Sequence, residues 1–201
     1  MVDNQMKIGI MGGSFNPIHE AHCKMAESFV REMDCDVCYF VPAAHSPLKM
    51  DDSYASPEHR LAMVQLAMHS NPLFKACDVE LKRGGESYTI DTIRWFQKQF
   101  PESSLFLLIG ADQAKAFTRW KQWEEIIDAV QLCIINREGI VEKDDITQTL
   151  TINSKSPVWI DFPIMNISSS MIRENIHSQK SIRNLVPMKV EEYIYEHKLF
   201  I

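Results

Sequence analysis

Two histidines near the start of the chain have a spacing that suits phosphate chemistry. His19 and His22 are three residues apart, so both side chains fall on one face of the first turn of a helix. They follow Gly12 and Gly13, which come directly after an apolar run. Glycines at this place let backbone N–H groups approach a phosphate, and the N-terminus of a helix offers donors with a partial positive charge. We therefore expect both imidazoles to contact one phosphate chain.

Other phosphate and metal motifs do not fit this segment. A P-loop needs Gly-x4-Gly-Lys-Ser/Thr, and a dinucleotide fingerprint needs Gly-x-Gly-x-x-Gly with an acidic residue about twenty positions later. Residues 12–22 contain neither pattern. A zinc site is poorly supported, because His-Glu-Ala-His is one residue short of His-Glu-x-x-His and the sequence indicates no third ligand. A glycine turn followed by two unrelated surface histidines is the remaining alternative.

The elements that must position these groups alternate along the chain. Apolar runs bounded by turn signals alternate with segments of helical period, which predicts β-α units and a parallel sheet. We expect a Rossmann-like, doubly wound parallel sheet with flanking helices in a single domain (1–201), with a core in 7–137 and a C-terminal part in 157–201. The predicted strands are 7–11, 37–41, 104–109, 132–136 and 158–162, with an extended segment at 75–81. The predicted helices are 19–33, 57–69 (with Pro57 in its first turn), 89–99, 111–127, 168–176 and 188–196, and 139–156 is predicted to be loop-rich.

The composition is that of an ordinary globular protein. The 201 residues are 45% hydrophobic and 24% charged, which excludes disordered and collagen-like classes. The formal net charge of -6 disfavours broad binding to nucleic acid or to an anionic membrane. The N-terminus lacks a basic region followed by a signal-type apolar block, so we expect a cytoplasmic protein. Five cysteines scattered through apolar runs are typical of reduced core thiols.

A second segment, residues 167–173 (Ile-Ser-Ser-Ser-Met-Ile-Arg), precedes another predicted helix. With the first segment, it makes the sequence resemble the HxGH nucleotidyltransferase superfamily, whose first motif binds ATP phosphates and whose second signature reads I-S-S-T-x-I-R. Within that superfamily the chain most resembles the bacterial nicotinate-nucleotide adenylyltransferases, from Lys7 almost to Phe200. The intermediate segments that carry this resemblance are 41–42 with 47–49, 85–92, 109–112, Trp120 with Trp123, and 186–200.

The resemblance implies transfer of the adenylyl group of ATP to nicotinate mononucleotide, giving deamido-NAD and pyrophosphate. The 5′-phosphate of the mononucleotide attacks the α-phosphorus directly, so neither an enzyme nucleophile nor a general base is needed. His19, His22 and Arg173 are the implied catalytic residues. Mg²⁺ is the expected partner of ATP, and no side chain is assigned to it as a ligand. The implied ATP-binding residues are Gly12, Gly13, Ser14, Phe15, Lys49, Ser168, Ser169 and Ser170.

Five residues are candidates for the second substrate. Trp120 offers a broad π face to a pyridine ring, although core packing with Trp123 is the alternative. The resemblance places Tyr88 and Thr89 near that ring, where the backbone N–H of Thr89 could bind the nicotinate carboxylate. Asp112 follows a buried strand and is a candidate for ribose hydroxyls, or else a helix cap. Arg137, also after a strand, is a candidate for the mononucleotide phosphate.

The sequence departs from the family pattern at three positions. Ala21 replaces the usual glycine of HxGH, Leu48 stands where a histidine often precedes the lysine, and Ser170 replaces threonine but keeps its hydroxyl. Two competing functions remain open. One is a sister enzyme that uses pantetheine phosphate, or CTP with a sugar or alcohol phosphate, and the other is a non-catalytic nucleotide- or NAD-binding module. Residues 42–56 are predicted to form a lid, and the sequence leaves homo-oligomerisation open.

Overall fold

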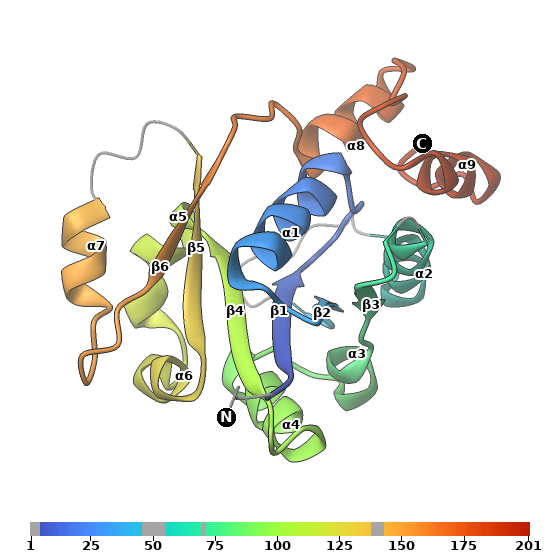
Figure 1. The fold of residues 1–201 in the computed structure, drawn as a ribbon. Helices are drawn as coiled ribbons and strands as arrows, with labels where there is room; N and C mark the ends of the chain where they lie inside the picture. Colours follow the sequence, from blue (N-terminus) through green and yellow to red (C-terminus); the bar gives the residue numbers. More distant parts are fainter. Residues whose placement is uncertain (1–4, 46–54, 70, 138–142) are drawn as a thin grey trace. The chain divides into compact units, whose positions relative to one another are not determined.

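The structure, a computed structural model, describes residues 5–45, 55–69, 71–137 and 143–201, and Figure 1 draws their fold. The strands are β1 (Lys7–Gly13), β2 (Val37–Pro42), β3 (Phe74–Ala76), β4 (Ser104–Gly110), β5 (Gln131–Arg137) and β6 (Val158–Phe162). The helices are α1 (Glu20–Met33), α2 (Pro57–Met68), α3 (Val79–Arg83), α4 (Thr89–Gln99), α5 (Ala111–Lys115), the 3-10 helix η1 (Phe117–Arg119), α6 (Trp123–Ala129), α7 (Lys143–Thr149), α8 (Ser169–His177) and α9 (Met188–Glu196).

The strands form one sheet in the order β3-β2-β1-β4-β5-β6. The pairs β1–β4, β4–β5 and β5–β6 are parallel, with Ile10 opposite Leu107 in the first pair. The central strand β4 buries Leu107 and its neighbour Leu108, as expected of a parallel strand covered on both faces. The order reverses between β1 and β4, and folds of this kind bind ligands beyond the carboxyl ends of strands at such a point. The predicted Rossmann-like, doubly wound parallel sheet is confirmed.

Contacts divide the chain into two compact units, and each is described by itself below. The first unit comprises the described parts of Met1–Gly12, Glu27–Tyr39 and Tyr88–Ile164. The second comprises the described parts of Gly13–Ala26, Phe40–Ser87 and Met165–Ile201. The predicted partition into residues 7–137 and 157–201 stays a prediction.

The first unit packs aromatic rings closely on its strands. A Cβ at Gly9 of β1 would lie 2.6 Å from a ring carbon of Phe29 in α1, so glycine permits this approach. Tyr39 of β2 packs against Phe96 of α4, with ring centroids 5.1 Å apart. The first contact joins β1 to the helix that follows it, and the second joins β2 to a helix that is distant in sequence.

The second unit joins α2 to α9. Ser56 caps α2 by accepting a hydrogen bond from the backbone N–H of His59 at 3.4 Å, and Pro57 lies in the first turn as predicted. His59 Nδ1 lies 2.9 Å from the hydroxyl of Tyr193 in α9. These contacts fix the last helix of the chain on α2. Within the described residues, every helix is too short or too polar to cross a bilayer.

The helix predicted over 111–127 is wrong as a single helix. It consists of α5, η1 and α6, with a break at 120–122. Trp120 has an extended backbone (φ -74°, ψ 145°) and Gln122 a left-handed one (φ 53°), and neither conformation continues an α-helix. The apolar period runs through the break because both flanking helices bury one face.

Two other predictions are corrected. Residues 139–156 were expected to be loop-rich, but α7 forms there, because Ile146 is buried and the indole N–H of Trp159 donates to Thr147 Oγ1 at 2.8 Å. An extended segment was predicted over 75–81, but the strand β3 ends at Ala76 and the helix α3 begins at Val79. In both cases the elements are too short for their period to be seen in the sequence.

Candidate active site

The turn between β1 and α1 is held by a buried aromatic ring. Phe15 is 2% exposed and has a left-handed backbone with φ 47°. Its ring meets the imidazole of His22 edge-on, with centroids 5.2 Å apart, and tilts against Phe40 at 5.8 Å. Phe15 therefore orients His22 by packing. A Cβ on Gly13 would lie 3.1 Å from that ring, whereas one on Gly12 would meet no described atom within 4 Å.

The two predicted histidines lie together. The rings of His19 and His22 are stacked, with centroids 3.6 Å apart and planes 20° apart. The backbone N–H of His19 donates to His22 Nδ1 at 3.2 Å. A ring nitrogen that accepts a hydrogen bond carries no proton, so in the neutral ring the proton of His22 lies on Nε2. That nitrogen is then a donor suited to an anionic oxygen.

The second predicted segment meets the first. The hydroxyl of Ser169 donates to the carbonyl of Pro17 at 2.9 Å, across 152 positions of sequence. Arg173 Nη1 donates to the carbonyl of Asn16 at 2.9 Å, across 157 positions. Both contacts lie within the second unit, so the start of α8 is fixed directly on the turn that precedes the histidines. Sequence spacing alone does not reveal this junction.

The three serines of the second segment have different contacts. Ser168 is the N-cap of α8, and its hydroxyl accepts from the backbone N–H of Met171 at 3.2 Å, which agrees with the predicted cap. Ser169 binds the Pro17 carbonyl, as described above. Ser170 lines a cavity together with Arg173. The hydroxyl that caps α8 therefore belongs to Ser168, and the serine that lines the cavity is Ser170.

A buried arginine, absent from the sequence-based candidates, supports the same turn. Arg60 of α2 is 3% exposed, and its guanidinium donates to the carbonyls of Ser14 at 2.9 Å and of Ala44 and Ala55 at 3.2 Å. The side-chain oxygen of buried Asn16 accepts from the backbone N–H of Ala55 at 2.9 Å. Arginine on a helix normally predicts a solvated face, so the sequence carried no signal for this role.

Arg60 therefore ties the first turn to both ends of the segment between 44 and 55. The predicted phosphate ligand Lys49 belongs to residues 46–54, which lie outside the described residues. Most of the predicted lid, including Leu48, lies there too. The described ends of that segment nevertheless have fixed partners, because Ser87 Oγ accepts from the backbone N–H of Ala44 at 2.9 Å.

The candidates for the second substrate belong to the first unit. Tyr88 is the N-cap residue of α4 and Thr89 its first residue, so the N–H of Thr89 is among the first amides of a helix. The ammonium of Lys121 lies over the ring of Tyr88, 4.1 Å from its centroid. This cation–π contact brings the residue after Trp120 to the start of α4.

The half-buried ring of Trp120 stacks on Phe117, with centroids 4.8 Å apart and planes 35° apart. The sequence suggested Trp123 as an alternative packing partner. Trp123 is the first residue of α6, and the ring that packs on Trp120 is that of Phe117. The contact with Phe117 supports one face of the indole.

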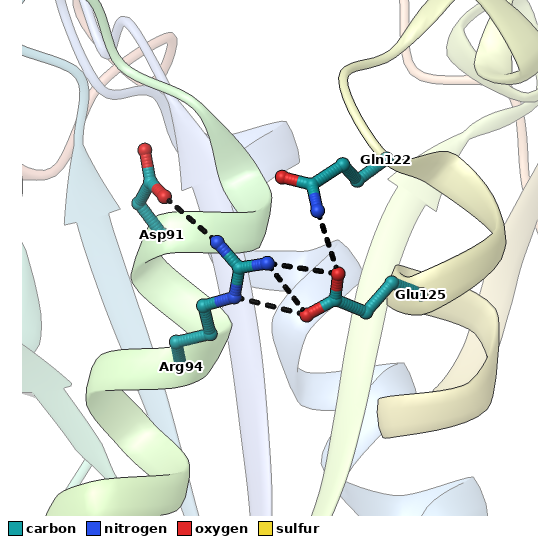
Figure 2. Close-up of polar contacts among 4 residues, drawn as sticks. All are labelled: Asp91, Arg94, Gln122 and Glu125. Carbon is teal, nitrogen blue, oxygen red and sulfur yellow. Dashed lines mark hydrogen bonds and ion pairs between the residues drawn. The ribbon is translucent and has the colours of Figure 1, made fainter.

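An ion-pair cluster links α4 to α6 (Figure 2). Arg94 donates two hydrogen bonds to the carboxylate of Glu125, from Nε at 2.9 Å and from Nη2 at 2.8 Å. Gln122 donates to the same carboxylate at 2.7 Å, and Asp91 lies 3.5 Å from Arg94 Nη1. The cluster connects the helix that begins at Thr89 to the break that contains Trp120.

Asp112 and Arg137 lie at or just after the carboxyl ends of β4 and β5. Asp112 lies in the first turn of α5 and is exposed, and the N-cap position belongs to Gly110, so Asp112 is not the cap. A Cβ at Gly110 would lie 2.5 Å from Asp112 Oδ1, so glycine leaves room for this carboxylate. Arg137 is the last residue of β5, with its backbone in register with Phe162 of β6.

The five cysteines lie in the described part of the chain, are buried and form no disulfide bond, in agreement with the sequence. Burial raises the pKa of Cys35 to about 12 and also raises the pKa values of Cys38, Cys77 and Cys133. A buried thiol with a raised pKa is a poor nucleophile and a poor metal ligand. Among the described residues, no group of three or more His, Cys, Asp or Glu side chains could hold a metal ion.

Comparisons with known proteins agree with this arrangement. A family model described as cytidylyltransferase-like matches residues 10–175. The chain is similar to Plasmodium falciparum nicotinic acid mononucleotide adenylyltransferase complexed with NaAD, with a TM-score of 0.77, 19% identity and 98% of each chain covered. The complex of that enzyme with APC gives a TM-score of 0.76 with the same identity and coverage. A Vibrio parahaemolyticus protein, provisionally assigned as a nicotinate-nucleotide adenylyltransferase, gives 0.68 at 18% identity, covering 98% of this chain and 96% of that one.

The structural likenesses show a shared fold over almost the whole chain. The family match includes both histidines of the first segment and extends through Arg173 of the second. These are the two segments that hydrogen bonds join in the structure. The predicted resemblance to the nucleotidyltransferases is thereby confirmed at family level, and the chain belongs to the cytidylyltransferase-like family.

Proposed function

We propose that this protein transfers the adenylyl group of ATP to nicotinate mononucleotide, forming deamido-NAD and releasing pyrophosphate. The observation that carries the proposal is the junction of the two segments, through Ser169 to Pro17 and through Arg173 to Asn16. It gathers two imidazoles, a guanidinium and a helix N-terminus within one unit. The names of the structural neighbours, one of them complexed with NaAD, support nicotinate mononucleotide as the acceptor.

The groups at this junction suit a phosphate chain. Nε2 of His22 carries the proton in the neutral ring and donates to a phosphate oxygen, while His19 supports it by stacking and by its backbone N–H. Arg173 offers a planar fork to oxygens of the β- and γ-phosphates, and the amides at the start of α8 add further donors. In the proposal Ser14 and the two preceding glycines let the nucleotide approach the turn, and Lys49 adds a cation.

The proposed reaction needs no covalent enzyme intermediate. An oxygen of the mononucleotide 5′-phosphate attacks the α-phosphorus of ATP, a new P–O bond forms, and the bond to the bridging α–β oxygen breaks in line. The electron pair leaves with pyrophosphate. The protein contributes position and stabilises the charge that accumulates on the phosphoryl oxygens. Nucleotidyltransferases generally use divalent metal ions, and Mg²⁺ bound with ATP would neutralise part of the charge of the phosphate chain, with no side chain of this protein assigned as its ligand.

The proposal assigns the acceptor to residues of the first unit. The exposed part of Trp120 stacks on the pyridine ring, with Phe117 supporting the indole. The N–H of Thr89, beside Tyr88, binds the nicotinate carboxylate, because the first amides of a helix favour an anion. Asp112 binds ribose hydroxyls and Arg137 the mononucleotide phosphate. The cytoplasmic location stays a prediction.

Pyrophosphate release tests this function. Wild-type protein with MgATP is supplied with nicotinate mononucleotide, nicotinamide mononucleotide or pantetheine phosphate, and with CTP in place of ATP. We expect the fastest release with MgATP and nicotinate mononucleotide. His22→Ala removes a proposed phosphate donor and is expected to reduce kcat/KM by about a hundredfold or more, a typical cost of losing one transition-state donor. His69→Ala, which removes an exposed histidine after α2, is the matched control and should leave the rate unchanged.

Each contrary result has one interpretation. Faster release with pantetheine phosphate or with CTP would replace the proposed acceptor or donor with that of a sister enzyme. Binding of MgATP and nicotinate mononucleotide without any product, in protein shown to be folded, would favour the non-catalytic module. An unchanged rate in His22→Ala would remove the histidine pair from the mechanism.

A further inference from the structure

A cavity of about 730 Å³ adjoins the second segment. All of its lining residues belong to the second unit, on the stretch before α2, on α8 and on the chain after α9 (Figure 1). A space of this size holds a ligand larger than a single ion. Its lining residues are Ala55, Ser56, Ser170, Arg173, Glu174, His177, Lys198, Leu199, Phe200 and Ile201.

One face of α8 forms a wall of this cavity. The lining positions 170, 173, 174 and 177 have the spacing of residues on one side of a helix. Arg173 sits where the cavity meets the first segment, because its Nη1 is bound to the carbonyl of Asn16. The cavity therefore extends along α8 from Ser170 and Arg173, beside the proposed phosphate site, to His177.

Two permanent cations are among the residues that line the cavity. Arg173 contributes one and Lys198 the other, on different elements. Within the described ranges, Lys198 forms no ion pair with an acidic side chain. The acidic residue of the wall, Glu174, accepts a hydrogen bond from the hydroxyl of Ser178 at 3.0 Å, on its own helix. Two cations around one space fit an oligoanion better than a neutral ligand.

Lys198 occupies a backbone position that favours glycine. It follows the C-cap of α9 with φ 49°, and the backbone N–H of the next residue, Leu199, closes the helix end by donating to Ile194 at 3.0 Å. Left-handed residues at helix ends are usually glycine, because other side chains are strained there. Helix termination therefore does not explain a lysine at this position.

We infer that Lys198 is a further ligand of the β- and γ-phosphates of the nucleoside triphosphate, and of the pyrophosphate formed from them, in the cavity that Arg173 also lines. The inference rests on the proposed function and adds to it a residue outside both sequence segments. The flexible stem of Lys198 lets its ammonium follow the phosphates as the α–β bond breaks. Lys198 then acts on binding of the triphosphate end and not on the acceptor.

Calorimetric titration with inorganic pyrophosphate and with MgATP tests this site without relying on turnover. Lys198→Gly removes the ammonium and suits the left-handed backbone, so we expect a thermal midpoint at or above that of the wild type. Lys198→Gln removes the charge while keeping a side chain and its strain. Lys189→Ala removes an exposed lysine of α9 that does not line the cavity. Both Lys198 variants should bind pyrophosphate and MgATP about tenfold more weakly, and Lys189→Ala as the wild type does.

The kinetic expectation is equally specific. Both Lys198 variants should raise KM for ATP by about tenfold and leave KM for nicotinate mononucleotide within about twofold. Unchanged affinity for pyrophosphate in the Gln variant, or no binding of pyrophosphate by the wild type, would overturn the site. If the wild type is active and the Lys198 variants have unchanged pyrophosphate affinity and KM for ATP, the role of Lys198 is refuted and the proposed function is kept. Pyrophosphate binding that depends on Lys198, in a protein that makes no product, would overturn adenylyl transfer and keep the phosphate site.

Discussion

Replacing Arg60 tests whether one buried guanidinium holds the proposed phosphate-binding turn in place. Three of its hydrogen bonds reach the carbonyls of Ser14, Ala44 and Ala55, and the side chain is almost fully buried. Arg60→Met fills most of the same volume but leaves those carbonyls without this donor. Arg60→Lys keeps the charge but loses the planar fork that reaches three acceptors.

The magnitude follows from these bonds. Hydrogen bonds to charged groups contribute roughly 1.5–3 kcal/mol each, so three give about 4.5–9 kcal/mol before the cost of burying the guanidinium is subtracted. Breaking a buried charged network by removing one partner costs about 3–5 kcal/mol, and we expect Arg60→Met to fall in that range. For Arg60→Lys, which can keep one or two of the bonds, we expect about 2 kcal/mol.

Urea unfolding followed by circular dichroism measures the loss. With a slope of about 2 kcal/mol per molar urea, Arg60→Met should lower the midpoint by about 1.5–2.5 M. Arg94→Met, which breaks the exposed pair with Glu125, is the matched control and should cost less than about 1 kcal/mol. The folded Arg60→Lys variant should also lose about tenfold in kcat/KM for ATP, because the turn is less well positioned. A loss below about 1 kcal/mol in Arg60→Met, with an unchanged slope, would refute the role assigned to the three bonds.

Three further predictions concern other parts of the molecule. Gly110→Ala places a Cβ 2.5 Å from the Asp112 carboxylate, so it should raise KM for nicotinate mononucleotide several-fold in steady-state assays, and an unchanged KM would remove Asp112 from the acceptor site. Arg94→Gln removes the hydrogen bonds that connect α4 to α6, so it should raise KM for the mononucleotide but not for ATP. The free energy of unfolding should fall by less than about 1 kcal/mol, and an equal effect on both KM values would contradict the prediction. Burial raises the pKa of Cys35 to about 12, so the folded thiol stays protonated while the unfolded thiol ionises near pH 9. The contribution of this thiol to the free energy of unfolding is therefore complete below pH 9 and is lost as the pH rises toward 12. One unit above the unfolded pKa the loss is about 1.4 kcal/mol for this thiol, and Cys35→Ala should show a shallower alkaline decline in urea midpoints; equal declines would refute it.

Local patterns were sufficient for the elements whose sequence and structure agree. The apolar run that became β4 is buried on both sides, and Ser168 caps α8 as its position before a helical segment predicted. The spacing of His19 and His22 placed both rings together, because three residues make almost one helical turn. Signals of this kind depend only on neighbours a few positions away, so they can be seen in a single sequence.

The sequence by itself thus determined the alternation of strands and helices, the turn with its two histidines and the second segment with its serines. Tertiary structure decided the rest. Gln122 adopts a left-handed backbone and interrupts a continuous helical period. Arg60, a residue type that is normally solvated, is buried and donates to three backbone carbonyls. The hydroxyl of Ser169 donates to the carbonyl of Pro17. The physical reason is that each outcome depends on acceptors and packing surfaces supplied by residues far away along the chain. Those partners are brought into reach only when the sheet has formed.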